Sequence, residues 1–318
     1  VQGQKVLVPV VYLSSSTALT LRSDGALIAS DNGDVSLNAT AGLSNRGTIS
    51  GVNVSATAGT LLNQGRIAGT GTVALQAKQD LLNRGGQIIG RDILLSAGHD
   101  LLSSTGDAVA GGAIRSGISA DNTLLMNAGH DLTLTGTAVQ AGGSAALQAG
   151  NNLVLQPTAL RNESGLTRGG DATSLTVGQD LSLLAGNDLQ LHGVAITAGG
   201  DAALQAGHDL SLTPITDANG KATGRTSIVT DGSLQLAAGH DVTIRQAEVK
   251  AGGDLIAAAG HDLNVTSVLG ESTTTTDHSR QGKTKVTTTT TTQDIDQQAL
   301  SAGGNLILSA GNDVNLVA

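Results

Sequence analysis

The sequence lacks aromatic residues almost completely and has no cysteine. Phenylalanine, tryptophan and cysteine are absent from its 318 residues, and Tyr12 is the only aromatic side chain. An ordinary globular core of this size relies on the large buried area of aromatic side chains. Their absence favours a thin core filled by Leu, Ile, Val and Ala, and the absence of cysteine excludes a disulfide framework.

Positive charge and long apolar runs are also scarce. The net charge is −9 and there is no basic stripe, so we expect no nucleic-acid partner. No apolar run reaches transmembrane length, and the apolar start at Val1–Leu13 lacks the charged residues that open a signal peptide. Because the chain opens and closes within its pattern, we expect it to be a piece of a longer protein.

A Gly-His-Asp motif returns along the chain, and its spacing predicts a solenoid. Asp188 and Asp209 are 21 residues apart, as are Asp241 and Asp262. A period of about 20 residues is typical of solenoids. The motif lies at 98–100, 129–131, 207–209, 239–241 and 260–262, with Gly-Asn-Asp variants at 186–188 and 311–313.

Each repeat divides into three short strands. Apolar residues alternate after the Gly-His-Asp turn, after a second turn of the Gly-Gly-Asp type, and again before the next Gly-Gly-Asp turn. Three strands in 21 residues must each pair with their copies one repeat later. The sequence therefore predicts an all-β, right-handed parallel β-helix of about a dozen three-strand coils. One expected inward ladder is Val139, Ile196, Val249 and Leu300.

Two repeat types divide this one continuous solenoid. Residues 1–97 carry a Leu-x-Asn-x-Gly pattern, and residues 98–318 carry the Gly-His-Asp pattern. We expect Asn45, Asn63 and Asn83 to stack as a ladder that shares amide hydrogen bonds.

Insertions fall at one corner of the predicted coil, after its second strand and before its third. They lie within 103–119, 156–174, 214–229 and 268–297. In solenoids, such insertions often mark the interaction face. The last is rich in threonine and predicts a projecting β-hairpin, with a disordered loop as the alternative. Its candidate interaction residues are Thr273, Thr274, Thr275, Thr276, His278, Arg280, Lys283 and Lys285.

The repeated His and Asp residues are better explained as turn residues than as metal ligands. His208, His240 and His261 share one corner, but Asn takes related positions at Asn187 and Asn312. His and Asn both tolerate left-handed turn conformations, and Asp at a turn accepts backbone N–H groups two residues on. Calcium-binding repeats need a nine-residue period, which is absent. We expect no metal and no cofactor.

No catalytic residues are predicted. Polysaccharide-cleaving β-helices need clustered carboxylates with basic residues, and usually aromatic platforms for sugar rings. Glu163, Glu248 and Glu271 are the only glutamates, and the aspartates lie mainly in turns. A lyase-type enzyme therefore ranks third among the functional hypotheses.

These repeats resemble those of filamentous haemagglutinin and of CdiA-type contact-dependent inhibition proteins. The resemblance is clearest in the Ala-Gly-Gly-Asp-Leu and Ala-Gly-His-Asp-Leu motifs at 251–263, in the Leu-x-Asn-x-Gly-x-Ile segments, and in the Thr-rich insertion. The start, at 6–13, resembles the opening of the second haemagglutinin-repeat region. The resemblance implies a secreted protein on the surface of a Gram-negative bacterium, exported by an outer-membrane two-partner secretion transporter.

The leading hypothesis is therefore a non-enzymatic stalk segment of such a protein, either an adhesin or a toxin carrier. Its role would be reach, with a part in toxin delivery across the outer membrane of a target cell. The alternative is an adhesin or receptor-binding module that uses the insertion face on a target-cell surface. The absence of cysteine suits a chain that crosses a periplasm unfolded.

Overall fold

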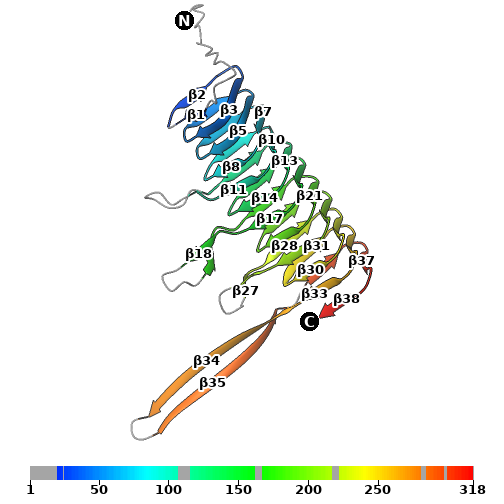
Figure 1. Ribbon diagram of the computed structural model, residues 1–318. Helices are drawn as coiled ribbons and strands as arrows, with labels where there is room; N and C mark the ends of the chain where they lie inside the picture. Colours follow the sequence, from blue (N-terminus) through cyan, green and yellow to red (C-terminus); the bar gives the residue numbers. More distant parts are fainter. Residues whose placement is uncertain are drawn as a thin grey trace, which may run out of the picture.

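The computed structural model of the protein is a parallel β-helix from which one long hairpin projects (Figure 1). It describes residues 20–23, 25–106, 115–161, 167–216, 222–280, 284–296 and 299–317. The prediction of a right-handed parallel β-helix is confirmed. Segment 6–13 lies outside the described residues. Among the described residues, no helix is long and apolar enough to cross a membrane.

Each complete coil contributes one strand to each of three faces. The first face consists of β7 (Thr72–Ala77), β10 (Asp92–Ala97), β13 (Leu124–Ala128), β16 (Ala145–Ala149), β21 (Leu181–Ala185), β24 (Ala202–Ala206), β29 (Leu234–Ala238), β32 (Leu255–Ala259) and β37 (Leu306–Ala310). The second consists of β1 (Thr20–Ser23), β8 (Leu81–Arg84), β11 (Leu101–Ser104), β14 (Leu132–Thr135), β17 (Leu153–Gln156), β22 (Leu189–His192), β25 (Leu210–Thr213), β30 (Val242–Arg245), β33 (Leu263–Thr266) and β38 (Val314–Val317). Strands β3 (Val35–Asn45) and β5 (Val54–Asn63) are longer and run through both faces.

The third face is a separate sheet of 11 parallel strands. It consists of β2 (Leu27–Ala29), β4 (Thr48–Gly51), β6 (Arg66–Gly69), β9 (Gln87–Gly90), β12 (Gly117–Ala120), β15 (Ala138–Ala141), β20 (Ser174–Val177), β23 (Ala195–Ala198), β28 (Thr226–Thr230), β31 (Ala247–Ala251) and β36 (Ala299–Ala302). The three junctions between faces are called corners below. The His–Asp corner joins the first face to the second, and the insertion corner joins the second to the third.

Among the described residues, three pairs of strands lie outside the coils. They are the hairpins β18 (Ala159–Arg161) with β19 (Thr167–Gly169), β26 (Ile215–Thr216) with β27 (Ala222–Gly224), and β34 (Val268–Arg280) with β35 (Thr284–Asp296). All three leave the rod at the insertion corner, as the sequence predicted for its insertions.

Pairing between coils keeps like residues in register. Val139 pairs with Leu175, which pairs with Ile196, and the same column continues through Ile228 and Val249 to Leu300. The predicted inward ladder is therefore confirmed, with Leu300 half-buried near the C-terminal end. Strand pairing also continues across residue 97, where the first repeat type gives way to the second, because β10 pairs with β7 and β11 pairs with β8.

The core is a single column of aliphatic side chains. Along most described strands of the coils, buried positions alternate with more exposed ones, as in β25, where Leu210 and Leu212 are fully buried and Ser211 is half-buried. Because each coil is thin, Leu, Ile, Val and Ala from the three faces fill its interior without aromatic residues.

Glycine in the Gly-His-Asp motif is required by the close approach of successive coils. A Cβ atom on Gly207 would collide with the carbonyl oxygen of Gly186, and one on Gly239 with that of Gly207. Neither glycine has a positive φ. The backbones simply stack with no room for a side chain between them.

The inward register gives a direct test of stability. Leu210→Asp places an unpaired carboxylate in the aliphatic column and should lower the free energy of unfolding by several kcal/mol. Ser211→Asp, one residue on, should lower it by less than about 1 kcal/mol. Chemical denaturation of both variants makes the measurement, and equal losses would contradict the register.

Candidate interaction surface at the insertion corner

Insertions alternate with tight turns along the insertion corner. Strands β8, β14, β22 and β30 pass to the third face within one or two residues, whereas β11, β17, β25 and β33 are followed by longer segments. The longer segments are 105–116, 157–173, 214–225 and 267–298. Insertions therefore leave every second coil, and the structural unit of this part of the rod is a pair of coils.

The tight turns use left-handed backbone conformations. Gly85, Gly136 and Gly193 have φ values of 68°, 61° and 57°, and Gln246 takes the equivalent place with φ 44°. A Cβ atom on Gly136 would lie 2.5 Å from Thr105 Oγ1 and 2.6 Å from Thr158 Cγ2. Those two threonines begin the insertions on either side, so the tight turn leaves room for them.

The spacing of the insertions suits stacked hairpins. Successive coils rise about 4.8 Å, so insertions from alternate coils start about 10 Å apart, which is the packing distance of two β-layers. Strands β19 and β27 come from neighbouring insertions, and their Cα atoms approach within 8 Å. The insertions thus form a row along one corner of the rod.

A buried hydroxyl closes the base of three insertions. Ser116 Oγ donates to the Ser104 carbonyl at 2.5 Å, Thr173 Oγ1 to that of Gln156 at 2.5 Å, and Thr226 Oγ1 to that of Thr213 at 2.7 Å. Each carbonyl belongs to the last residue of the second strand, where the insertion leaves the rod.

The same hydroxyls accept a hydrogen bond from the preceding coil. The donors to Ser116 and Thr226 are the N–H groups of Gly85 and Gly193, at 2.9 Å and 2.8 Å. Each hydroxyl therefore joins the two ends of its insertion to the tight turn beneath. Sequence analysis missed these residues, although each stands two positions before a buried Ile or Leu of the third face.

Removing one hydroxyl should destabilise the rod measurably. Thr226→Val keeps the shape of the side chain but removes the hydrogen bonds of its hydroxyl. Because the Gly193 N–H and the Thr213 carbonyl keep a hydrogen bond to each other at 3.0 Å, the loss should cost about 1 kcal/mol. The matched change Thr197→Val, at an exposed position of the third face, should cost under about 0.5 kcal/mol. Urea denaturation compares the two, and a neutral Thr226→Val would show that the hydroxyl does not close the insertion.

The predicted threonine hairpin is confirmed. Strands β34 and β35 pair antiparallel over 13 residue pairs, with Thr275 opposite Thr289, and the hairpin extends away from the rod (Figure 1). Of the predicted interaction residues, Thr273 to Thr276, His278 and Arg280 lie on β34 and Lys285 lies on β35. Lys283 lies outside the described residues.

The His–Asp corner carries a ladder of hydrogen bonds between coils. His240 Nδ1 lies 3.0 Å from Asp209 Oδ1, and the backbone N–H of Asp241 donates to the same oxygen at 3.0 Å. Because a carboxylate only accepts hydrogen bonds, the His ring must carry a proton on Nδ1. The pattern recurs at His99, His130 and His261.

Two expectations about this corner were wrong. Gln246 is the only described non-glycine residue with a positive φ, so the His and Asn residues are not left-handed. The Asp carboxylates also bond to the next coil, not to a backbone N–H two residues on. Asn appears in place of His because its Nδ2 can make the same bond, as Asn312 does to Asp262 Oδ1 at 2.9 Å.

These contacts stabilise the ionised carboxylates. Burial opposes the charge of Asp209, but hydrogen bonds from the Asp241 N–H and His240, with the nearby charges of His208 and His240, hold its pKa below the ordinary value. The pKa of Asp100 is lowered in the same way. Since folding lowers these pKa values, their stabilisation is present at neutral pH and is lost as the pH falls through them.

The His rings stack along the corner, at a spacing wider than that of two ligands of one zinc ion. His208 and His240 stack with centroids 4.8 Å apart, and His240 and His261 with centroids 4.9 Å apart. Three groups each bring two His and one Asp together within 4.8 Å. Two ligands of one zinc ion lie at most about 4.2 Å apart, so a shared ion would require the stacked rings to move.

Replacing the three histidines with asparagine should leave the melting temperature nearly unchanged. In the triple variant of His208, His240 and His261, each Asn Nδ2 can donate to the Asp of the preceding coil, as Asn312 already does. Thermal unfolding monitored by circular dichroism, with and without zinc, makes the test. A zinc-dependent rise in the wild type that the variant loses would contradict this assignment.

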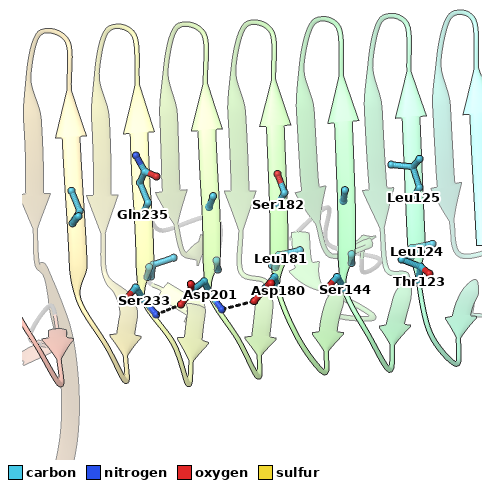
Figure 2. A pocket seen from close by; sticks show the side chains of 16 residues that line it. Thr123, Leu124, Leu125, Ser144, Asp180, Leu181, Ser182, Asp201, Ser233 and Gln235 are labelled. Carbon is cyan, nitrogen blue, oxygen red and sulfur yellow. Dashed lines mark hydrogen bonds between the residues drawn. The ribbon is translucent and has the colours of Figure 1, made fainter.

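A shallow trough of about 700 Å³ lies on the first face, across β13 to β32 (Figure 2). The side chains on its floor are small and uncharged, and include those of Ala146, Ser182 and Ala203, which face outward. At its edge, Asp180 Oδ1 accepts from the Asp201 N–H at 3.0 Å, and Asp201 Oδ1 from the Ser233 N–H at 2.7 Å. Both carboxylates thus serve coil stacking.

Comparison with known proteins agrees with this repeat architecture. The hemagglutinin repeat family matches residues 104–164 and 215–299, which include the alternating insertions. These two matches, which together cover less than half of the chain, support a haemagglutinin-repeat region. Each matched segment contains one complete insertion and part of a second, together with the coils between them.

Curated relatives are CdiA proteins of Escherichia coli. A tRNA nuclease CdiA from strain STEC_O31 is 30% identical over 224 residues, covering 62% of this chain and 7% of that protein. A toxin CdiA is 30% identical over 194 residues, covering 56% of the chain and 6% of that protein. These matches support a haemagglutinin-repeat region of the CdiA type, and the chain spans only a small fraction of these relatives' length. No solved structure matches it.

Proposed function

We propose that the chain is a non-enzymatic stalk segment of a large secreted protein on the surface of a Gram-negative bacterium. The whole protein would be an adhesin or a carrier of a contact-dependent inhibition toxin, as the names of the CdiA relatives suggest. The observation that carries the proposal is unbroken parallel pairing from β2 to β36, which gives reach along one axis.

Export through an outer-membrane two-partner secretion transporter fits this architecture. After the first coil, every described strand of the coils pairs with the coil before it, so coils can add one at a time as the chain emerges. The transporter would recognise parts of the protein other than these repeats. In a toxin carrier, the stalk would help to bring the toxin to the outer membrane of the target cell.

A second candidate function is binding to a target-cell surface through the insertion corner. The support for it is the row of insertions, which vary in length while the coils keep one register. The residues proposed for contact are Thr273 to Thr276, His278, Arg280, Lys283 and Lys285 at the end of the row.

Deleting the long hairpin separates the two functions. Replacing residues 271–297 with a short Gly-Ser link should leave a folded rod of unchanged length, because β33 and β36 already pair with their own neighbours in the coils. Shortening the loop should change the free energy of unfolding by about 1 kcal/mol or less. Small-angle scattering and denaturation measure length and stability.

Binding of the two proteins to bacterial and host surfaces completes the test. Binding lost with the deletion, but kept when residues 159–169 of the β18–β19 hairpin are replaced instead, would assign adhesion to the long hairpin. Binding unchanged by either deletion would favour the stalk role alone. Global unfolding of the 271–297 deletion would contradict the independence of the rod.

A further inference from the structure

The first face of the rod is uncharged along almost its whole length. In its strands from β5 to β37, the only charged residue is Asp92, at the start of β10. The chain as a whole carries a net charge of −9, so its charged residues lie elsewhere. Depletion of charge is what distinguishes the centre of a protein interface from the rest of a protein surface.

Exposed leucines lie on the same face. Leu94 on β10, Leu125 on β13 and Leu184 on β21 are 41%, 42% and 37% exposed. The other exposed large apolar residues of the described chain belong to β2, β37 or β38, in the first and last described coils. Between those ends, exposed large apolar side chains therefore gather on the first face alone, and such a patch marks a binding surface.

One outward column of this face has large and small side chains in blocks. Figure 2 shows the middle of the column, with Ser182 between Leu125 and Gln235. From β5 to β32 the order is two small residues, two large, three small and two large, so the column has two ridges and two hollows. The three small residues are the floor of the trough. In order, one coil apart, the members are Ser55, Ala74, Leu94, Leu125, Ala146, Ser182, Ala203, Gln235 and Ile256.

We propose that the first faces of two copies of this chain pack against each other, with the rods antiparallel about a two-fold axis along β16. Reversing the column about Ala146 puts a large residue opposite a small one at every other position. Each ridge then fills a hollow of the second copy, as side chains of two packed sheets interdigitate. The facing pairs are Leu125 with Ser182, Leu94 with Ala203, Gln235 with Ala74, and Ile256 with Ser55.

Neighbouring registers lose this match. Moving the second copy by one coil in one direction puts Leu94 opposite Gln235, so two large side chains compete for the same space. Moving it by one coil in the other direction puts Ala74 opposite Ala203, which leaves a void. The pattern of large and small residues therefore selects one register.

The other outward column of the face fits the same register. Leu184 faces Asn127 of the second copy, which stands two residues from Leu125 on β13, so Leu184 comes beside the leucine ridge of the second copy. Large residues again face small ones in the pairs Gln76 with Ala237 and Gln205 with Ser96.

The contact is large enough for a stable dimer. Nine coils at about 4.8 Å and strands of about 16 Å give about 700 Å² per copy and about 1,400 Å² in total, within the range of specific interfaces. Sugars favour aromatic platforms and membrane surfaces favour basic and aromatic residues, and the strands of this face from β5 to β37 contain neither. Pairing of two rods goes beyond the stalk role and does not depend on it.

Sedimentation analysis of the whole chain measures the association directly. The wild type should form dimers at micromolar concentration. Leu125→Asp buries a carboxylate at two places in the dimer and should weaken association by more than about tenfold. The matched change Thr197→Asp, at an exposed position of the third face, should leave association unchanged. A wild type that stays monomeric up to high micromolar concentration, or equal effects of the two changes, would overturn the proposal.

Exchanging a ridge and a hollow tests the register. Leu125→Ala should weaken association because it leaves a void, and Ser182→Leu because it opposes two leucines, each by about tenfold. The double variant should associate like the wild type, since the large and small residues have then changed places. A double variant that is weakened by the product of the two single effects would overturn the register.

Salt supplies the last arm of the test. Both copies carry a net charge of −9, and in this register Asp92 of one copy comes near Asp201 of the other at one rim of the contact. Because the contact contains no ion pair, screening of this repulsion should tighten association when ionic strength rises from about 0.05 M to about 0.5 M. Association that weakens with salt would show a contact made by opposite charges and would overturn the proposal.

Discussion

The hydrogen bonds between successive coils are the constraint on which the rest of this structure depends. In the coils, each strand pairs with the equivalent strand of the neighbouring coil. A residue at one position must therefore be compatible with the residue at the same position one coil away. This explains why the core is an aliphatic column and why glycine stands where backbones touch. It also explains the stack of aspartates: each carboxylate accepts the backbone N–H of the next Asp, which fixes the coils to one another.

Inside the insertion corner, polar contacts between successive coils are made in two ways. In the first coils Asn45 donates to Asn63 and Asn63 to Asn83, a buried amide ladder that the sequence predicted. Asn83 then donates to Ser103 Oγ, and the ladder ends there, directly before the first insertion. Beyond it the equivalent inward position is aliphatic, with Leu134 in the next coil and Ile244 and Val265 further on. The buried hydroxyls of Ser116, Thr173 and Thr226 then supply the polar contacts. The Asn amides stack where the corner has the same conformation in every coil. The single hydroxyls occur where tight turns alternate with insertions.

Much of the fold could be predicted from the sequence because the same local sequence pattern recurs in successive coils. The period of 21 residues, the alternation of Leu210, Ser211 and Leu212, and the shared place of the insertions all follow from local patterns. The alternation of tight turns and insertions was not predicted, since it is a property of pairs of coils and shows only when Gly136 or Gly193 is placed beneath its neighbours. The role of histidine was also misread. Its side chain, not its backbone, meets the requirement of the corner, and a hydrogen bond to the preceding coil is invisible in a single repeat.

Residues inserted at one corner lose the backbone hydrogen bonds that the stacked coils provide. A residue within the coils has its backbone groups satisfied by the coils on either side, whatever its side chain. A residue in an insertion has left that stack and must find other partners. The short insertions close on a buried hydroxyl, and strands β19 and β27 of two neighbouring insertions approach within 8 Å. Among the described strands, the two of the threonine hairpin pair only with each other, which leaves two edges to be satisfied by water or by another strand. The part of the rod that is freest to change is therefore also the part whose backbone is most available for binding.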